Sequence, residues 1–203
     1  MSRSIPELER VCVFCGSNFG KDPAYREAAR TLGDTLVERG IGLVYGGGNV
    51  GLMGVIADRV LAQGGEVIGV IPQSLVDREV AHQGLTELHV VDSMHARKAK
   101  LYALGDAVIA MPGGVGTFEE LFESFTWNQL QLHFRPAGLL NVAGYYDPLI
   151  AMLDRAVDQG FVRAPHREAL VVSESGDDLL EQLAAVARRG GAQWMRPKSE
   201  EEL

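Results

Sequence analysis

Two adjacent carboxylates follow a glycine-rich stretch in the middle of the chain. The stretch runs from Pro112 to Thr117, and Glu119 and Glu120 come directly after it. A carboxylate in such a place can accept a proton or stabilise positive charge on a reacting group. If Thr117 opens a helix, both carboxylates lie in its first turn, where the helix dipole favours the ionised form. Adjacent helical residues point about 100° apart, so we expect one of the two to face a ligand.

Two cations lie just upstream, in the segment from Met94 to Lys98. This segment follows a predicted strand and opens a predicted helix, with Asp92 or Ser93 available as its N-cap. We expect it to meet the carboxylates at one edge of the sheet. Arg97 and Lys98 would then donate to a phosphate or to a substrate that develops charge. The alternatives are a solvated helix face here and ordinary helix-start charge at the two glutamates.

Glycines gather where predicted strands end. The three stretches are Cys15-Gly16-Ser17-Asn18, Gly46-Gly47-Gly48-Asn49-Val50-Gly51-Leu52-Met53-Gly54, and Pro112-Gly113-Gly114-Val115-Gly116-Thr117. Glycine lets the backbone approach a ligand closely, and the helix that follows offers free N–H groups to an anion. Any one stretch is equally explained by a tight turn. Three of them at one sheet edge predict a ligand that carries phosphate.

Several better-known motifs are missing. The P-loop requires Gly-Lys-Ser/Thr after its glycines, and the second stretch matches the dinucleotide fingerprint only loosely. Ser17 lacks the surroundings of a nucleophile elbow, so we expect it to donate a hydrogen bond or cap a helix. Five scattered histidines without metal-binding spacing predict no metal site.

Short apolar runs alternate with longer helical patterns along the chain. The predicted strands are 11–14, 42–45, 66–71, 87–91, 107–111, 138–141 and 169–172, and the predicted helices are 23–39, 51–63, 94–104, 117–131, 148–159 and 177–188. Asp22-Pro23 and Asp147-Pro148 are start signals, and Gly40 and Gly160 are stop signals. This order predicts an α/β fold: a doubly wound, mostly parallel, Rossmann-like sheet of about seven strands with helices on both faces.

Length and composition limit the number of domains, the partners and the cellular compartment of the protein. A chain of 203 residues without a linker-like break predicts one domain over 1–203, with flexible tails at 1–9 and about 190–203. A net charge of -8 argues against a duplex nucleic acid partner, and the longest apolar runs are too short for a membrane span. Cys12 and Cys15 lie three apart along a strand, which predicts two buried, reduced thiols. With no apolar signal core near Met1, we expect a cytoplasmic protein.

The two central segments resemble those of a known family. Pro112-Gly113-Gly114-Val115-Gly116-Thr117-Phe118-Glu119-Glu120 fits the pattern P-G-G-x-G-T-x-x-E, and Ser93-Met94-His95-Ala96-Arg97-Lys98 fits its companion S/D-M-H-x-R-K. These motifs are similar to those of the LOG ("lonely guy") phosphoribohydrolases, which have long been mislabelled as lysine decarboxylases. The similarity extends from about Val11 to Leu180.

The resemblance implies hydrolysis of the N-glycosidic bond of an N6-modified adenosine 5'-monophosphate to free base and ribose 5-phosphate. It implies no cofactor, a homodimer, and Arg97 and Glu120 as the catalytic pair. Together with the glycine stretches it predicts these substrate-binding residues: Ser17, Gly46, Gly47, Gly48, Gly51, Met53, Glu79, Met94, Arg97, Lys98, Pro112, Gly113, Gly114, Val115, Gly116, Thr117, Phe118, Glu119 and Thr126.

Two other functions remain open from the sequence. One is an AMP nucleosidase of broad specificity, which tolerates an unmodified adenine. The other is a non-catalytic carrier of a nucleotide or of molybdenum cofactor, because related Rossmann-like proteins bind that cofactor. A carrier needs the phosphate loops but not the pair of Arg97 and Glu120, so the presence of both residues favours the enzyme.

Overall fold

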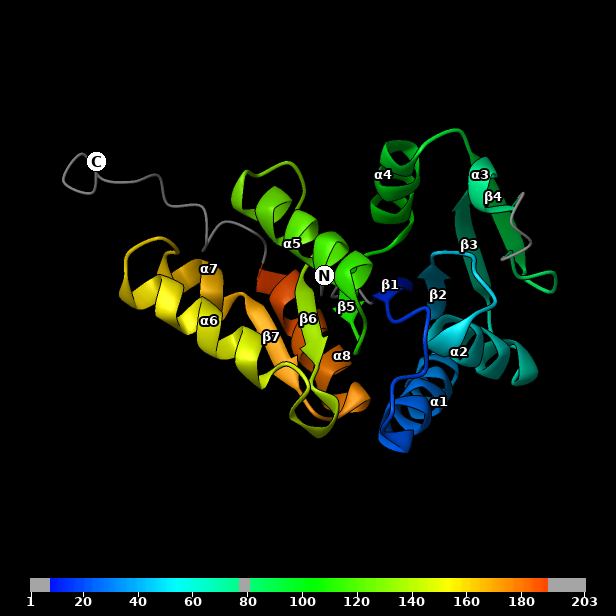
Figure 1. Ribbon diagram of the computed structural model, residues 1–203, viewed down its shortest axis with the longest axis horizontal. Helices are drawn as coiled ribbons and strands as arrows, with labels where there is room; N and C mark the ends of the chain where they lie inside the picture. Colours follow the sequence, from blue (N-terminus) through cyan, green and yellow to red (C-terminus); the bar gives the residue numbers. More distant parts are fainter. Residues whose placement is uncertain (1–7, 77–80, 190–203) are drawn as a thin grey trace, which may run out of the picture.

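The computed structural model describes residues 8–76 and 81–189, which form a sheet of seven parallel strands (Figure 1). The strands stand in the order β4-β3-β2-β1-β5-β6-β7. Their bounds are Arg10–Phe14 (β1), Gly42–Tyr45 (β2), Val67–Pro72 (β3), Glu87–Val91 (β4), Ala107–Ala110 (β5), Ala137–Leu140 (β6) and Leu170–Ser173 (β7). The predicted fold class is confirmed, and the sheet is entirely parallel.

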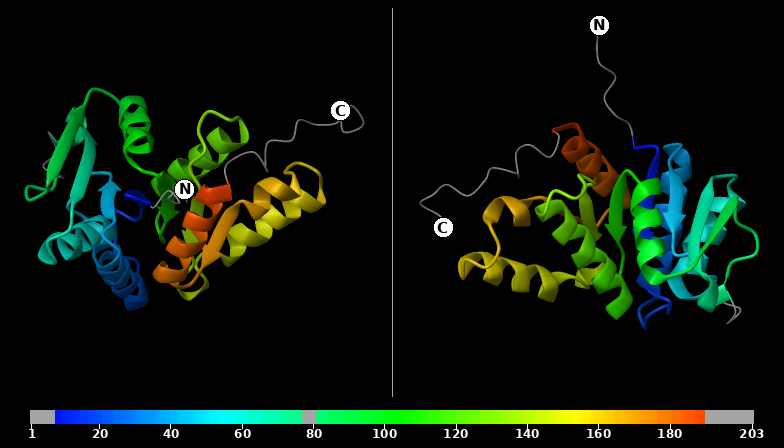
Figure 2. Two further views of the ribbon diagram at one scale, coloured as in Figure 1. Left: turned by 180° about the vertical axis from the view of Figure 1, so that it is seen from behind. Right: turned by 90° about the horizontal axis from the view of Figure 1, so that it is seen from above.

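Helices cover both faces of the sheet (Figures 1 and 2). They are Pro23–Glu38 (α1), Gly51–Ala62 (α2), Gln73–Val76 (α3), Met94–Leu104 (α4), Val115–Gln129 (α5), Asp147–Asp158 (α6), Ala164–Glu168 (α7) and Gly176–Arg189 (α8), with a 3-10 turn at Val142–Gly144 (η1). One face packs against α1, α2 and α8, and the other against α4, α5 and α6. A fully buried leucine such as Leu32 or Leu101 contributes about 1.5–3 kcal/mol of hydrophobic stabilisation to these layers.

Strand β1 shows how the two cores are separated. Val11 and Val13 join the core under α1, α2 and α8, whereas Cys12 and Phe14 join the core under α4, α5 and α6. Successive strand residues point to opposite faces, so Cys15 lies on the other side from Cys12. Both thiols are buried and free, as predicted, and burial raises the pKa of each.

The strand order reverses beside β1. The chain moves outward from β1 through β2, β3 and β4, and then crosses back through α4 to β5 on the other side of β1. Open parallel sheets bind ligands beyond the carboxyl ends of their strands at such a point. Here the loops after β1 and β5 meet there, and these loops contain Gly16 and Gly113.

The start of α5 differs from the prediction. The helix begins at Val115 with Gly114 as its extended N-cap, two residues before Thr117. Glu119 and Glu120 therefore lie in the second turn, beyond the closest reach of the helix dipole. Glycine is one of the residues favoured at an N-cap, which agrees with a start at Val115.

The predicted start and stop signals of the other helices have different outcomes. Asp22 caps α1 as predicted, accepting from the N–H of Ala24 at 2.8 Å. Asp147 is instead the first residue of α6, and its carboxylate accepts from the amide of Asn141 at 2.7 Å. Gly40 and Gly160, the predicted stops, have positive φ angles of 68° and 77°.

Parts of the predicted tails, 1–7 and 190–203, lie outside the described residues. Leu8 and Glu9, which the prediction placed in the first tail, are held in place: Leu8 is buried, and the N–H of Glu9 donates to Asp106 at 2.9 Å. In the part of the chain that is described, no helix is long and apolar enough to cross a membrane.

Candidate active site

The three glycine stretches converge at the point where the strand order reverses. The N–H of Gly16 donates to the carbonyl of Pro112 at 3.0 Å, and the N–H of Leu52 donates to the carbonyl of Gly16 at 2.9 Å. Gly51 has a φ of 57°, and a side chain there would collide with the backbone of Ser17. The predicted meeting of these stretches is therefore confirmed, and glycine is required for the approach of the first two.

A cavity of about 250 Å³ opens between these loops. Backbone and small residues line one part of it: Gly16, Ser17, Asn18, Gly20, Pro112, Gly113 and Gly114. Phe19, Tyr25, Leu52 and Tyr145 supply apolar walls. The sequence analysis did not single out Tyr25 or Tyr145, because aromatic residues in a helix and a turn carry no spacing that distinguishes a cavity wall from a core.

The helix starts around the cavity are uncapped by side chains. The N-caps of α2 and α5 are Val50 and Gly114, and neither makes a side-chain capping bond. By contrast, Asp22 caps α1, and Ser93 caps α4 by accepting from Ala96 at 3.1 Å. A helix start without a side-chain cap leaves backbone N–H groups for an anion.

A buried ion pair joins α4 to α5. The guanidinium of Arg97 lies 3.3 Å from the carboxylate of Glu120, and the two side chains are 10% and 11% exposed. Arg97 also donates through Nε to the carbonyl of Val70 at 3.1 Å and through Nη2 to that of Gly46 at 3.5 Å. A side chain at Gly46 would occupy the place of this guanidinium, so glycine is needed there. The structure thus brings together the pair that the sequence predicts.

Glu120 holds its proton more tightly than an ordinary carboxyl. Burial disfavours the charged form and raises the pKa of Glu120 to about 7, and the charges of Glu119 and Glu123 act in the same direction. Arg97 and Lys98 lower this pKa but do not outweigh burial. The expectation that the helix dipole keeps this group ionised is therefore wrong, because desolvation dominates. Near neutral pH the group exists in both forms, as proton transfer requires.

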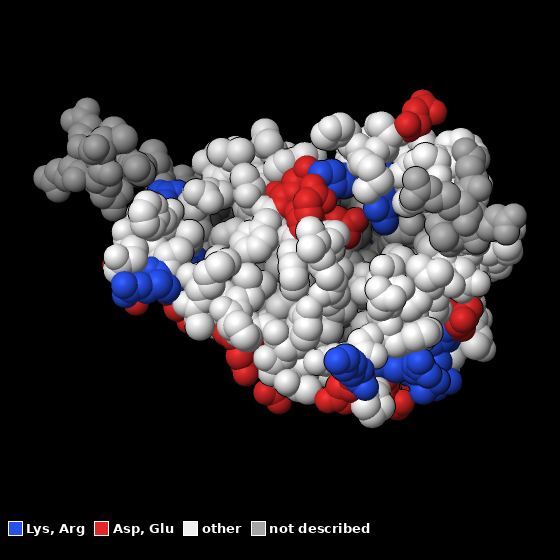
Figure 3. All heavy atoms as spheres, viewed as in Figure 1, with Lys and Arg blue, Asp and Glu red and all other residues white. Residues whose placement is uncertain are grey.

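Glu119 belongs to a different cluster. Its side chain is 52% exposed and accepts from Lys98 at 2.5 Å, while Lys98 also contacts Glu123 at 2.8 Å. The hydroxyl of Tyr102 donates to the carbonyl of Glu120 at 2.9 Å and to the carboxylate of Glu123 at 3.3 Å. Figure 3 shows these opposite charges side by side where α5 faces α4. Of the two adjacent carboxylates, Glu120 is the one turned to Arg97.

The remaining predicted residues are spread around this centre. Met53 lies beside Gly46, whereas Met94 and Val115 are exposed, Val115 by 82%. Thr117 is buried against Gly113, and Phe118 packs beside Tyr145 with ring centroids 6.4 Å apart.

Three further predicted positions lie at the margin. Thr126 is exposed on the same face of α5 as Glu119 and Glu123. Gly47 and Gly48 are tied to the segment after 80, where the N–H of His82 donates to the carbonyl of Gly47 at 2.9 Å and Gly48 pairs with Ala81. Glu79 falls outside the described residues.

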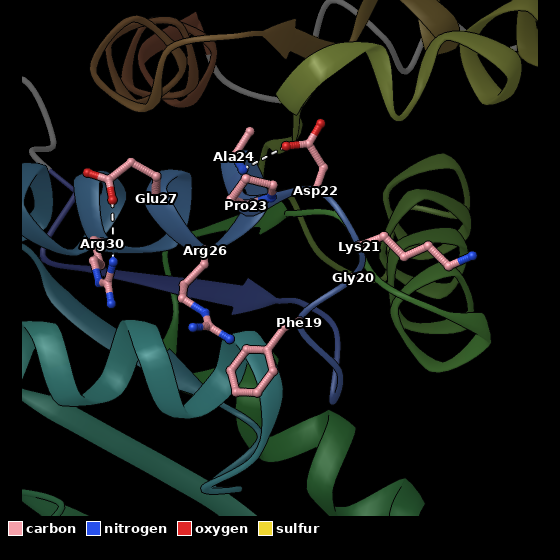
Figure 4. Close-up of a pocket in the computed structure, with 9 residues that line it drawn as sticks. All are labelled: Phe19, Gly20, Lys21, Asp22, Pro23, Ala24, Arg26, Glu27 and Arg30. Atoms are coloured by element: carbon pink, nitrogen blue, oxygen red, sulfur yellow. Dashed lines mark hydrogen bonds and ion pairs between the residues drawn. The ribbon is translucent and has the colours of Figure 1, made fainter.

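A larger hollow of about 510 Å³ lies at the start of α1 (Figure 4). Three of its charged groups have partners: Glu27 pairs with Arg30 at 3.4 Å, and the guanidinium of Arg26 lies 4.0 Å above the Phe19 ring. Lys21 extends away from them (Figure 4). Asp22 serves as the helix cap. Because these groups are surface-exposed and none is placed for proton transfer, we locate the chemistry at Arg97 and Glu120 instead.

Comparison with known proteins gives the family. A family model described as possible lysine decarboxylase matches residues 53–183. The chain is 53% identical over 173 residues to a probable cytokinin riboside 5'-monophosphate phosphoribohydrolase of Oryza sativa subsp. japonica, covering 85% of this chain and 70% of that protein. It is 49% identical over 183 residues to a cytokinin riboside 5'-monophosphate phosphoribohydrolase of Arabidopsis thaliana, covering 90% and 84%. The chain belongs to the LOG family.

Solved structures share the fold of this LOG-family chain. A molybdenum cofactor binding protein of Rippkaea orientalis superposes with a TM-score of 0.67 at 22% identity, covering 90% of this chain and 99% of that one. The molybdenum cofactor carrier protein of Chlamydomonas reinhardtii gives 0.63 at 16%, covering 87% and 96%. At these identities the likeness extends to the fold alone.

Lys98 does not fit the role of the lysine in a pyridoxal phosphate site, which the description "lysine decarboxylase" would imply. A lysine that forms a Schiff base needs a neutral amine. The pKa of Lys98 is raised, because hydrogen bonds and charge from Glu119 and Glu123 outweigh its burial. Among the described residues no cluster of three or more potential ligands could hold a metal ion.

We predict that one glutamate carboxyl titrates near pH 7. Carbon-13 NMR of glutamate-labelled protein should show this titration in the wild type and in Glu119→Gln, but not in Glu120→Gln. The pKa of this carboxyl is raised in the folded chain, so its contribution to stability is present below about pH 4.5 and is lost as the pH rises through 7. Titration of every carboxyl below about pH 5 would contradict the burial of Glu120.

We predict that Gly46→Ala displaces the Arg97 guanidinium. Because Arg97 lowers the pKa of Glu120, the same NMR titration should then move above 7. Gly84→Ala is the matched control, since Gly84 lies outside the site and an added Cβ would meet His82 only at 3.4 Å. An unchanged titration in Gly46→Ala would show that Arg97 does not set the charge of Glu120.

Proposed function

We propose that this chain hydrolyses the N-glycosidic bond of cytokinin riboside 5'-monophosphates, releasing the free base and ribose 5-phosphate. The LOG relatives that are about half identical to it are named for this reaction. The observation that carries the proposal is the buried pair of Arg97 and Glu120, one to two helical turns from an uncapped helix start. A carrier of the same fold would not need a carboxyl with a pKa of about 7 at that place.

The phosphate end of the substrate fits the start of α5. The backbone N–H groups around Gly113, Gly114 and Val115 are suited to an anion, and the helix dipole adds to their attraction. From Val115 to Glu120 the helix rises about 7.5 Å. This distance suits a ribose ring whose 5'-phosphate sits at the helix start and whose C1' carbon faces Glu120.

Glu120 then acts on the reacting bond, and Arg97 holds Glu120 in position. The bond from C1' to the base nitrogen breaks and leaves positive charge on the ribose. Ionised Glu120 stabilises this charge and takes a proton from the attacking water, whose oxygen bonds to C1'. Glu120 then releases this proton, and the departing base nitrogen takes one up, so the water is divided between the ribose and the base. Arg97 keeps Glu120 oriented and sufficiently acidic to be ionised near neutral pH.

Measurement of the released products tests this function directly. The protein is incubated with isopentenyladenosine 5'-monophosphate and, separately, with AMP, and free base and ribose 5-phosphate are measured. We expect release from the cytokinin nucleotide, and the rate with AMP reports how far the pocket demands an N6 substituent. Tight binding of both nucleotides without release of either base would favour a carrier.

Substitution of the two carboxylates should separate their roles. We expect Glu120→Gln to lower kcat by at least about 100-fold while nucleotide binding persists, because the amide can neither ionise nor accept the proton of water. Glu119→Gln should cost less than about tenfold, since Glu119 is exposed and faces Lys98. If Glu119→Gln abolishes turnover and Glu120→Gln is benign, the assignment is reversed.

We propose further that the protein is a homodimer in the cytoplasm. Leu130, Leu132 and Phe134, which follow α5, are 61%, 65% and 53% exposed, and such a patch suits an interface. The buried, reduced thiols of Cys12 and Cys15 agree with a reducing compartment.

Sedimentation velocity tests the dimer. The wild type should sediment as a dimer, and Leu132→Lys should shift it toward the monomer because a charge in an apolar interface is costly. Met152→Lys, at another exposed apolar residue far along the chain, is the control. A monomeric wild type at micromolar concentration would refute the proposal.

A further inference from the structure

Three successive carbonyl groups of the loop after β5 are held by donors from outside that loop. The hydroxyl of Tyr146 donates to the carbonyl of Met111 at 2.6 Å. The N–H of Gly16 donates to the carbonyl of Pro112 at 3.0 Å. The hydroxyl of Tyr145 donates to the carbonyl of Gly113. The loop that precedes α5 is therefore fixed one peptide at a time.

Two of these contacts decide where the loop's N–H groups point; the third holds the carbonyl of Met111, which precedes Pro112 and therefore orients no N–H. A trans peptide is planar, with its carbonyl and the next N–H on opposite sides. Holding the carbonyl of Pro112 toward Gly16 turns the N–H of Gly113 away from Gly16. Holding the carbonyl of Gly113 toward Tyr145 turns the N–H of Gly114 away from that hydroxyl. Without these donors the glycine peptides are free to rotate and to present a carbonyl, which repels phosphate.

The turn after β6 is shaped to aim both tyrosines at this loop. Asn141 accepts from the N–H of Tyr146 at 2.7 Å and donates to Asp147 at 2.7 Å. Ala143 has φ 50° and ψ 36°, and Gly144 has φ 69°. A left-handed alanine is strained and persists where the surrounding contacts require it, often near functional sites. The strain lies directly before Tyr145 and Tyr146.

The two rings cannot act in the same way. Tyr146 is 1% exposed and packs at 81° to Tyr145, with ring centroids 5.1 Å apart. Phe118 of α5 lies against both rings. Tyr145 lines the cavity, whereas Tyr146 does not and contacts the ring of Tyr145 and the carbonyl of Met111. An effect of Tyr146 on ligand binding must therefore be transmitted by that ring or by the loop.

We propose that Tyr145 is a positioning residue that holds the amide of Gly114 toward the 5'-phosphate of the substrate, while Tyr146 anchors an earlier peptide of the same loop. The proposal rests on the proposed function only in placing the phosphate at this loop. It predicts that the Tyr145 hydroxyl matters for ligands that carry phosphate and not for the corresponding nucleoside.

The experiment compares AMP with adenosine by calorimetry in a Glu120→Gln background, so that nucleotide is not consumed. Tyr145→Phe should weaken AMP binding about fivefold, the equivalent of one hydrogen bond of about 1 kcal/mol, and leave adenosine binding unchanged. Tyr146→Phe should weaken AMP binding less, because its hydroxyl holds a peptide without an N–H. Tyr45→Phe is the matched control. It removes a buried tyrosine hydroxyl that has no hydrogen-bond partner among the described residues, and it should leave both affinities unchanged.

Other outcomes overturn the inference. Equal weakening of AMP binding and adenosine binding in Tyr145→Phe would mean a loss of packing. Unchanged AMP binding would mean that the hydroxyl does not orient the loop. If Tyr146→Phe does not fold, the half-buried Tyr145→Phe decides alone. A background protein that binds AMP no better than adenosine would refute the phosphate placement. If the wild type does not hydrolyse the nucleotide but Tyr145→Phe selectively weakens AMP binding, the proposed reaction is refuted and the inference about the loop is supported.

Discussion

The burial of one ion pair sets the conditions for the rest of the site. Arg97 and Glu120 are each about nine-tenths removed from solvent, and charges in such a place are stable only with close partners. Arg97 finds them in Glu120 and in the carbonyls of Val70 and Gly46. Desolvation still dominates the pKa of Glu120 and raises it to about 7, so protonated and ionised forms coexist near neutral pH. A carboxyl present in both forms can accept or donate a proton.

The topology of the sheet explains why this pair can form. Helix α4 leads from the outer strand β4 back to β5 at the centre, and α5 follows β5 directly. Both helices cover the same face, so Arg97 near the start of α4 meets Glu120 near the start of α5. The carbonyls that fix Arg97 come from β3 and from the loop after β2. The Arg97 side chain thus connects its own helix α4 with the loop after β2, with β3 and with α5.

Glycine acts differently at the neighbouring loops. At Gly46 it leaves room for the guanidinium of Arg97, and at Gly51 it lets α2 start against the backbone of Ser17. At Gly113 it admits the side chain of Thr117, so the first turn of α5 closes over the loop. The absence of a side chain makes room for the Arg97 guanidinium, for a loop contact and for a helix start in turn, although each position is glycine in the sequence.

The sequence by itself determined the parallel α/β fold and the strand ends at which glycines gather. These follow from local patterns: apolar periodicity, and start and stop signals. Arg97 and Glu120 were expected as a pair only because the motifs resemble those of the LOG family. Only the tertiary structure decided that Glu120 is buried while Glu119 pairs with Lys98, because the packing of α5 on the sheet fixes which face loses water. It likewise revealed Tyr145 and Tyr146, since a contact across more than 30 residues with a backbone carbonyl leaves no pattern in the chain.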